Sequence, residues 1–168
     1  MENAAIFSIF PVLVVFAGAS DLLTMTIPNR VSILLILAFG LMGVLAGFSV
    51  QEWGIHLLGA AAVFLPCFFM FFLGWMGGGD AKVASAIALW FGFGASLTQF
   101  LLLTTIYGMV LTFGILAFRF IPVLPGFCLG QAWLLKLHDK KTGIPYGIAI
   151  SAAALQTYSS SAWFDLLS

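Results

Sequence analysis

Long apolar segments separated by short polar breaks run along almost the whole chain. A bilayer crossing needs roughly 20 mainly apolar residues, about 17 to 25, and a lipid-exposed backbone must satisfy its own hydrogen bonds, which favours helices. The pattern predicts an all-α integral membrane protein with about six transmembrane helices, in a single multi-pass domain covering residues 1–168. The six predicted spans are residues 4–20, 31–50, 54–74, 83–97, 99–118 and 144–163.

Composition supports a membrane protein. The 168 residues are 62% hydrophobic and only 7% charged, and the mean hydropathy is +1.16, far from the balance of soluble domains. The net charge of zero argues against a nucleic-acid partner. The first apolar segment follows Glu2 rather than a basic region, so we expect a retained span and not a removable signal peptide.

The basic residues predict the orientation of the chain. With six spans, the first, third and fifth loops share one side of the membrane, and this side receives all six basic residues. The positive-inside rule makes it cytoplasmic, so we expect both termini outside the cytoplasm and the protein in the cytoplasmic (inner) membrane. The six residues are Arg30, Lys82, Arg119, Lys136, Lys140 and Lys141.

Two aspartates, Asp21 and Asp80, lie at the predicted cytoplasmic ends of apolar spans. Ionisable groups at such depth are costly and usually functional. Simpler interpretations remain: Asp21 as a marker of a helix end, and Asp80 as an acidic residue that is favourable to a helix N-terminus. If the two carboxyl groups converge, one of them retains a proton, and the pair can act as general acid and general base.

Small and polar residues flank both aspartates. Gly77, Gly78 and Gly79 precede Asp80, either as a flexible connector or to let a substrate backbone and a neighbouring helix approach. Pro28 and Asn29 lead into the second span, where Asn29 can cap the helix. Lys82 either snorkels to the membrane interface or tunes the site.

Together these residues resemble the type IV prepilin peptidase family of membrane aspartyl proteases. The motifs are Asp21 with Ile27-Pro28-Asn29, Gly77-Gly78-Gly79-Asp80 with Lys82, and Ile144-Pro145-Tyr146-Gly147, in the expected order. The resemblance implies that Asp21 and Asp80 are the catalytic pair, without a cofactor or metal. It implies a prepilin substrate, cut between a short basic leader and a hydrophobic helix at the cytoplasmic membrane face. Pro145, Tyr146 and Gly147 would help to shape the site, although a helix start, an interfacial aromatic ring and helix packing also explain them.

Longer members of that family carry an amino-terminal region, often with paired Cys-x-x-Cys motifs, and also methylate the new amino terminus. This chain contains no Cys-x-x-Cys, so we expect no separate soluble or methyltransferase domain. The short form is similar to the peptidases of tight-adherence (Flp-type) pili and to archaeal preflagellin peptidases.

Two other classes of function remain open at this point. The first is a small transporter or channel in which both aspartates are cation or proton sites, and the second is a non-enzymatic subunit of a secretion apparatus.

His56 and His138 fall on opposite predicted faces of the membrane, which argues against a shared metal site. The phenylalanine-rich segment 64–72 is expected to face lipid, with part of it available to a substrate helix.

Overall fold

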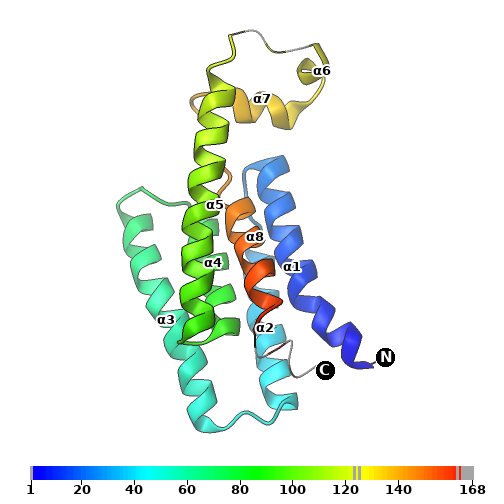
Figure 1. The fold of residues 1–168 in the computed structure, drawn as a ribbon, viewed down its shortest axis with the longest axis vertical. Helices are drawn as coiled ribbons and strands as arrows, with labels where there is room; N and C mark the ends of the chain where they lie inside the picture. The colour runs from blue at the N-terminus through cyan, green and yellow to red at the C-terminus, as the bar shows by residue number, and fades with distance from the viewer. Residues whose placement is uncertain (1, 123, 125, 162, 164–168) are drawn as a thin grey trace.

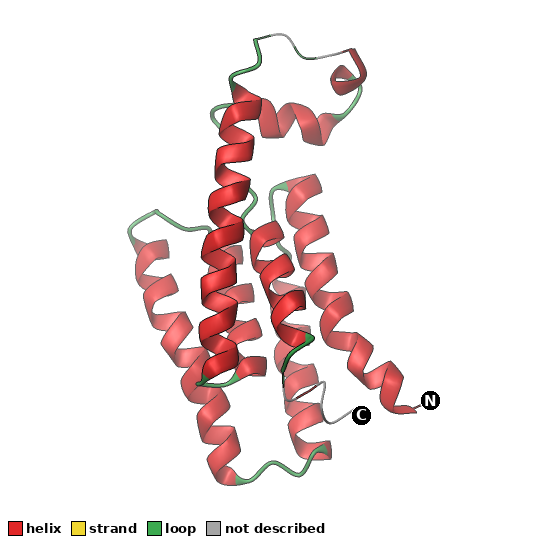
Figure 2. Cartoon of the chain, viewed as in Figure 1, coloured by secondary structure: helices red, strands yellow, loops and turns green. Residues whose placement is uncertain are grey.

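Every regular element in the described part of the chain is a helix, which confirms the all-α part of the predicted fold class (Figures 1 and 2). The computed structural model describes residues 2–122, 124, 126–161 and 163. The helices are α1 (Glu2–Thr24), α2 (Asn29–Leu45), α3 (Val50–Phe72), α4 (Gly78–Phe91), α5 (Ala95–Arg119), α6 (Gly126–Leu129), α7 (Ala132–His138) and α8 (Gly147–Tyr158).

The longer helices, α1 to α5 and α8, run up and down through one bundle, and each covers most of one predicted span. In Figure 1, α1, α3 and α5 rise toward the end that carries α6 and α7, whereas α2, α4 and α8 descend from it. The N-terminus and the last described residues lie at the opposite end. All six basic residues lie toward the end that carries α6 and α7: Arg30 in the first turn of α2, Lys82 in the second turn of α4, Arg119 at the end of α5, Lys136 in α7, and Lys140 and Lys141 after it.

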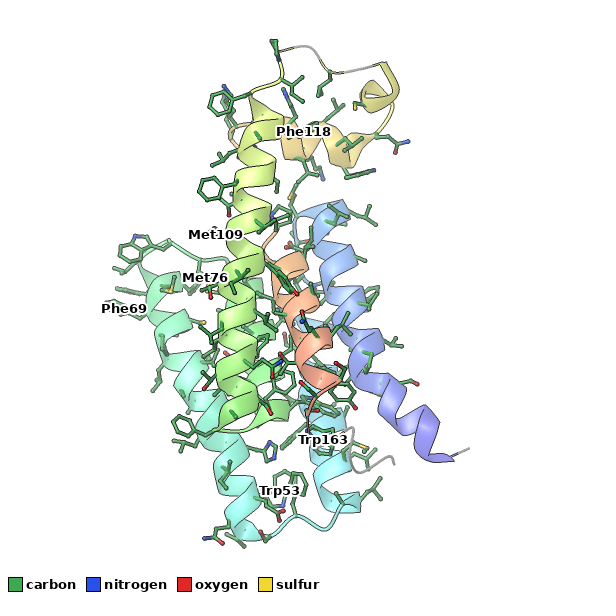
Figure 3. All side chains as sticks on the ribbon, in the orientation of Figure 1. Trp53, Phe69, Met76, Met109, Phe118 and Trp163 are labelled. Carbon is green, nitrogen blue, oxygen red and sulfur yellow. The ribbon has the colours of Figure 1, made fainter. Side chains whose placement is uncertain are left out.

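Helix α4 is the central element of this bundle. It packs against α2, α3 and α8, and most of its side chains from Ala81 to Phe91 are buried. Its 14 residues span about 21 Å, less than the roughly 30 Å of a hydrocarbon core. Trp90 fixes its far end: the indole donates a hydrogen bond to the carbonyl of Leu35, and its own carbonyl accepts one from the indole of Trp163 (Figure 3).

The outer surface is apolar, as a membrane protein requires. Among the described residues, α3 and α5 are long and apolar enough to cross a membrane, and two shorter apolar helices cover Ser8–Thr24 and Asn29–Leu45. Large hydrophobic side chains along α2, α3 and α5 are exposed. Most of segment 64–72 is exposed in this way, and Phe69 projects from the outer side of α3 (Figure 3).

Several predicted boundaries were wrong. Helix α1 continues past Asp21 and ends where Met25 adopts a left-handed conformation, with φ of 61°. The predicted span 83–97 combined two elements, because the chain breaks at Gly92, with φ of 65°, before α5 begins at Ala95. The loop predicted after α5 contains two short helices, α6 and α7.

Candidate active site

Ile27 is the point at which the three sequence motifs meet. A Cβ atom added to Gly79 on α4 would lie 3.3 Å from the Ile27 Cβ, and one added to Gly147 on α8 would lie 2.9 Å from the Ile27 Cδ1. Ile27 itself is buried. The connection between α1 and α2 is therefore clamped between the starts of α4 and α8, and this brings segments from three distant parts of the sequence together.

Asp21 lies near the end of α1 and is only 5% exposed. The backbone N–H of Gly147 donates a 2.7 Å hydrogen bond to its Oδ2 atom. A Cβ on Gly147 would lie 2.8 Å from both the Cβ and the Oδ2 of Asp21. Only glycine permits so close an approach, so Gly147 has a more specific role than general helix packing.

Asp80 lies in the first turn of α4, directly behind the three glycines. Each glycine faces a different neighbour: a Cβ on Gly77 would lie 3.0 Å from the Asp80 Oδ2, one on Gly78 would lie 3.1 Å from the ring of Phe71, and that on Gly79 meets Ile27. Gly77 is the N-cap with φ of −67°, so left-handed freedom is not the reason for it. Gly77 therefore leaves space for the Asp80 carboxyl group, whereas Gly78 and Gly79 let Phe71 and Ile27 approach the start of α4.

Both aspartates line one cavity of about 810 Å³ at the end of the bundle near α6 and α7. Met76, one of its lining residues, lies between α3 and α5 in the view of Figure 3. The cavity walls come from the ends of α1 and α3, from α5, and from the segment that leads into α8. Besides Asp21 and Asp80, its polar lining residues are Thr104, Arg119, Thr142 and Tyr146.

The surroundings of Asp80 favour its protonated form. Burial, and next the negative charge of Asp21, raise the pKa of Asp80 from 3.8 to about 7. Burial also raises the pKa of Asp21, and the hydrogen bond from the Gly147 N–H opposes this shift because it stabilises the carboxylate. A pair with one proton and two different environments can supply an acid and a base to the same reaction.

Asn29 at the start of α2 and Lys82 on α4 contact each other. The Lys82 Nζ donates a 3.0 Å hydrogen bond to the Asn29 Oδ1. The prediction that Asn29 caps α2 was wrong, because α2 begins at Asn29 with Pro28 as its N-cap residue and no side-chain cap. The pair instead connects the start of α2 to the second turn of α4, on the face of that helix that points away from Asp80.

Pro145 and Tyr146 line the cavity. The ring of Tyr146 covers Gly108 of α5, where a Cβ would lie 3.1 Å from the Tyr146 Cε1, and its hydroxyl is 2.9 Å from the Thr112 hydroxyl. Tyr146 is therefore fixed against α5. It serves as the N-cap residue of α8, so Pro145 precedes the helix without starting it.

Sequence reasoning missed Thr104 and Arg119 as cavity residues. The Thr104 hydroxyl oxygen is buried without a hydrogen-bond partner, whereas Thr98, Thr105 and Thr112 on the same helix bond to backbone carbonyls. In the sequence, Arg119 contributes only to the predicted orientation of the chain in the membrane. The one signal for a further role is that this arginine lies at the end of an apolar segment.

A second cavity, of about 650 Å³, lies between α2, α3 and α4 and contains neither aspartate. It faces α4 through Lys82, Ser85, Ala86 and Leu89. At about 100° per residue, this face points away from Asp80. Neither His56 nor His138 lines the cavity of the aspartates.

Comparison with known proteins gives one family match. The model of the type IV leader peptidase family matches residues 8–117, a range that includes both aspartates but ends before Arg119 and Gly147. No curated protein and no solved structure matches the chain. Because the match covers well over half of the sequence and both cavity carboxylates, the chain belongs to the type IV leader peptidase family and is an aspartic-type prepilin peptidase.

Proposed function

We propose that this peptidase cleaves prepilins of the Flp type between a short basic leader and the hydrophobic helix, with Asp21 and Asp80 as its catalytic pair. The observation that carries the proposal is that both carboxyl groups line one cavity. The whole chain acts as one multi-pass peptidase unit in this proposal.

Asp21 acts as the general base and Asp80 as the general acid. The Gly147 N–H favours the ionised form of Asp21, and the pKa of Asp80, about 7, keeps a proton available. Asp21 takes a proton from water as the water oxygen bonds to the scissile carbonyl carbon, while Asp80 polarises the carbonyl oxygen. The C–N bond then breaks as Asp80 gives its proton to the leaving amine. Transfer of the proton from Asp21 to Asp80 restores the starting state.

The cavity is long enough for an extended peptide. Thr104 and Arg119 both line it, and their separation of 15 positions along α5 corresponds to about 22 Å. An extended chain of roughly six residues covers that distance. We infer that the residues around the scissile bond lie along α5, past the ring of Tyr146.

The cavity faces the cytoplasm in this proposal, in the inner membrane. Arg30, Lys82 and Arg119 lie at the same end of the bundle as the cavity, in the ends of α2, α4 and α5 that the positive-inside rule assigns to the cytoplasm. A substrate helix lying in the bilayer would then present its cytoplasmic end to the two aspartates.

The test uses the purified full chain with an Flp-type prepilin substrate. Asp21→Asn and Asp80→Asn should each nearly abolish cleavage, while Asp139→Asn, which changes an exposed aspartate between α7 and α8, should cleave like the wild type. Cleavage retained in either cavity variant would exclude the pair. Faster processing of a preflagellin than of the prepilin would instead favour the archaeal-type substrate.

A further inference from the structure

Arg119, the last residue of α5, is only 9% exposed although its guanidinium group is charged. Its Nε atom donates a hydrogen bond to the Leu137 carbonyl at 2.8 Å. Its Nη2 atom donates to the carbonyls of Thr142 at 3.0 Å and Gly143 at 2.9 Å, and to the Thr142 hydroxyl at 3.2 Å. One buried side chain therefore holds both the end of α7 and the segment that follows it.

The partners of Arg119 within the described residues are carbonyl and hydroxyl oxygens, not carboxylates. A buried charge is costly unless it is fully hydrogen-bonded, and hydrogen bonds from a charged donor are about twice as strong as neutral ones. The planar guanidinium group requires its acceptors at fixed positions. The position of segment 137–143 is therefore coupled to that of the Arg119 side chain.

This segment leads directly to the catalytic carboxylate. Thr142, Gly143, Ile144, Pro145 and Tyr146 all line the cavity, and the next residue, Gly147, donates its N–H to Asp21. The Thr142 hydroxyl also donates to the carbonyls of Lys136 and Asp139, which closes the turn before the cavity wall.

We propose that Arg119 is a positioning residue that, by holding Leu137, Thr142 and Gly143, fixes the cavity wall and aims the Gly147 N–H at Asp21. This inference rests on the proposed function of Asp21. It assigns a role in catalysis to a residue beyond the region that matches the family.

The first test compares Arg119→Met, which keeps an apolar stem but removes the donors, with Arg119→Lys and with Arg30→Met. Arg30 is an exposed arginine in the first turn of α2, at the same end of the molecule, and it lines neither cavity. We expect Arg119→Met to lower kcat by about 100-fold, the cost of misplacing a catalytic group by about 1 Å. Arg119→Lys should recover part of this loss, and Arg30→Met should match the wild type. An Arg119→Met enzyme as active as Arg30→Met overturns the inference.

The second measurement tests directly whether Arg119 holds the cavity wall in place. Amide hydrogen exchange at residues 142–147 should be faster in Arg119→Met than in the wild type, while α4 keeps its protection. Unchanged exchange at these residues would overturn the inference even if kcat fell, because the segment would then not depend on Arg119.

If Arg119→Met does not fold, Arg119→Lys and Thr142→Val provide the test. Each should lower kcat, and the double variant should lose less than the product of the two single effects, because both changes act on one hydrogen-bonded unit. Independent effects would overturn the inference. Asp21→Asn in the same assay separates the two proposals: an active Asp21→Asn enzyme contradicts the catalytic pair, whereas a fully active Arg119→Lys/Thr142→Val enzyme contradicts only the role of Arg119.

Discussion

The backbone N–H of Gly147 donates a 2.7 Å hydrogen bond to the Asp21 Oδ2, although the two residues lie 126 positions apart. The same two helices meet again one turn deeper, where the Ser151 hydroxyl donates to the Val14 carbonyl and a Cβ on Gly18 would lie 2.9 Å from the Ser151 Oγ. Close packing of α1 against α8 therefore sets the position of the carboxylate, and the Gly147 N–H orients it.

Gly147→Ala should remove most of the peptidase activity. The added methyl group would lie 2.8 Å from the Asp21 Oδ2 and 2.9 Å from the Ile27 Cδ1, so α8 must move away from α1 and the hydrogen bond must lengthen. We expect a loss of about 100-fold in kcat and a destabilisation of about 1 to 3 kcal/mol from overpacking. Steady-state cleavage and thermal unfolding of the purified protein measure the two effects.

Gly114→Ala is the matched control, since Gly114 lies on α5 and a Cβ there would meet no atom within 4 Å. Its activity should equal that of the wild type. If Gly147→Ala also cleaves at the wild-type rate, the close contact between α8 and Asp21 is not needed for catalysis.

The order and helical nature of the spans could be predicted because each apolar segment carries its own signal in the sequence. The exact ends of the helices could not be predicted. The charge of Asp21 predicts that the first helix ends there, yet α1 continues to Thr24, and the buried Asp21 accepts a hydrogen bond from the Gly147 N–H. The break at Gly92 lies within continuous apolar sequence, and no change in polarity marks it.

The candidate site could also be predicted from the sequence only in part. Asp21, Asp80 and the three glycines before Asp80 could be predicted as site residues, because both charges lie at the ends of apolar spans and the motifs that resemble the family are local. The packing of Ile27 against both Gly79 and Gly147 is tertiary, and no local pattern predicts it. Arg119 was missed because its acceptors are mostly backbone carbonyls, which every residue carries and no sequence pattern distinguishes.

The contact between Lys82 and Asn29 should contribute to catalysis more than to stability. Both side chains are exposed, so their hydrogen bond of 3.0 Å should stabilise the fold by about 1 kcal/mol or less. It nevertheless holds the start of α2 against α4 two residues after Asp80. Lys82→Met and Asn29→Ala should each lower kcat with little change in the unfolding temperature.

The double variant distinguishes a shared role from two separate ones. If Lys82 and Asn29 act as a pair, Lys82→Met combined with Asn29→Ala should be no slower than the worse single variant. Multiplicative losses in kcat would mean that each residue acts on the site independently.

The proposed orientation can be tested by labelling single cysteines in intact cells and inverted vesicles, in a background that lacks Cys67 and Cys128. Lys140→Cys lies at the end of the bundle that holds the cavity, and Gln51→Cys lies at the other end; both positions are exposed. A membrane-impermeant thiol reagent should reach Lys140→Cys only from the cytoplasmic side and Gln51→Cys only from outside. The opposite pattern would place the aspartates away from the cytoplasm.

The protonation of Asp80 should make stability depend on pH. Its pKa rises on folding from 3.8 to about 7, through burial and the charge of Asp21. Between these values the folded protein holds a proton that the unfolded chain has released, so the free energy of unfolding should fall as pH rises through this window. Cleavage should also fall as pH rises above about 7, because Asp80 then loses the proton that the leaving amine needs.

Asp80→Asn separates this titration from the others in the protein. The amide does not ionise, so the unfolding temperature of Asp80→Asn should change less with pH than that of the wild type. The variant should also be more stable than the wild type above about pH 7. Asp139→Asn, at an exposed position, should keep the wild-type pH dependence. A parallel decline in Asp80→Asn and wild type would mean that Asp80 is already ionised in the folded protein at neutral pH, and it could not then serve as the acid.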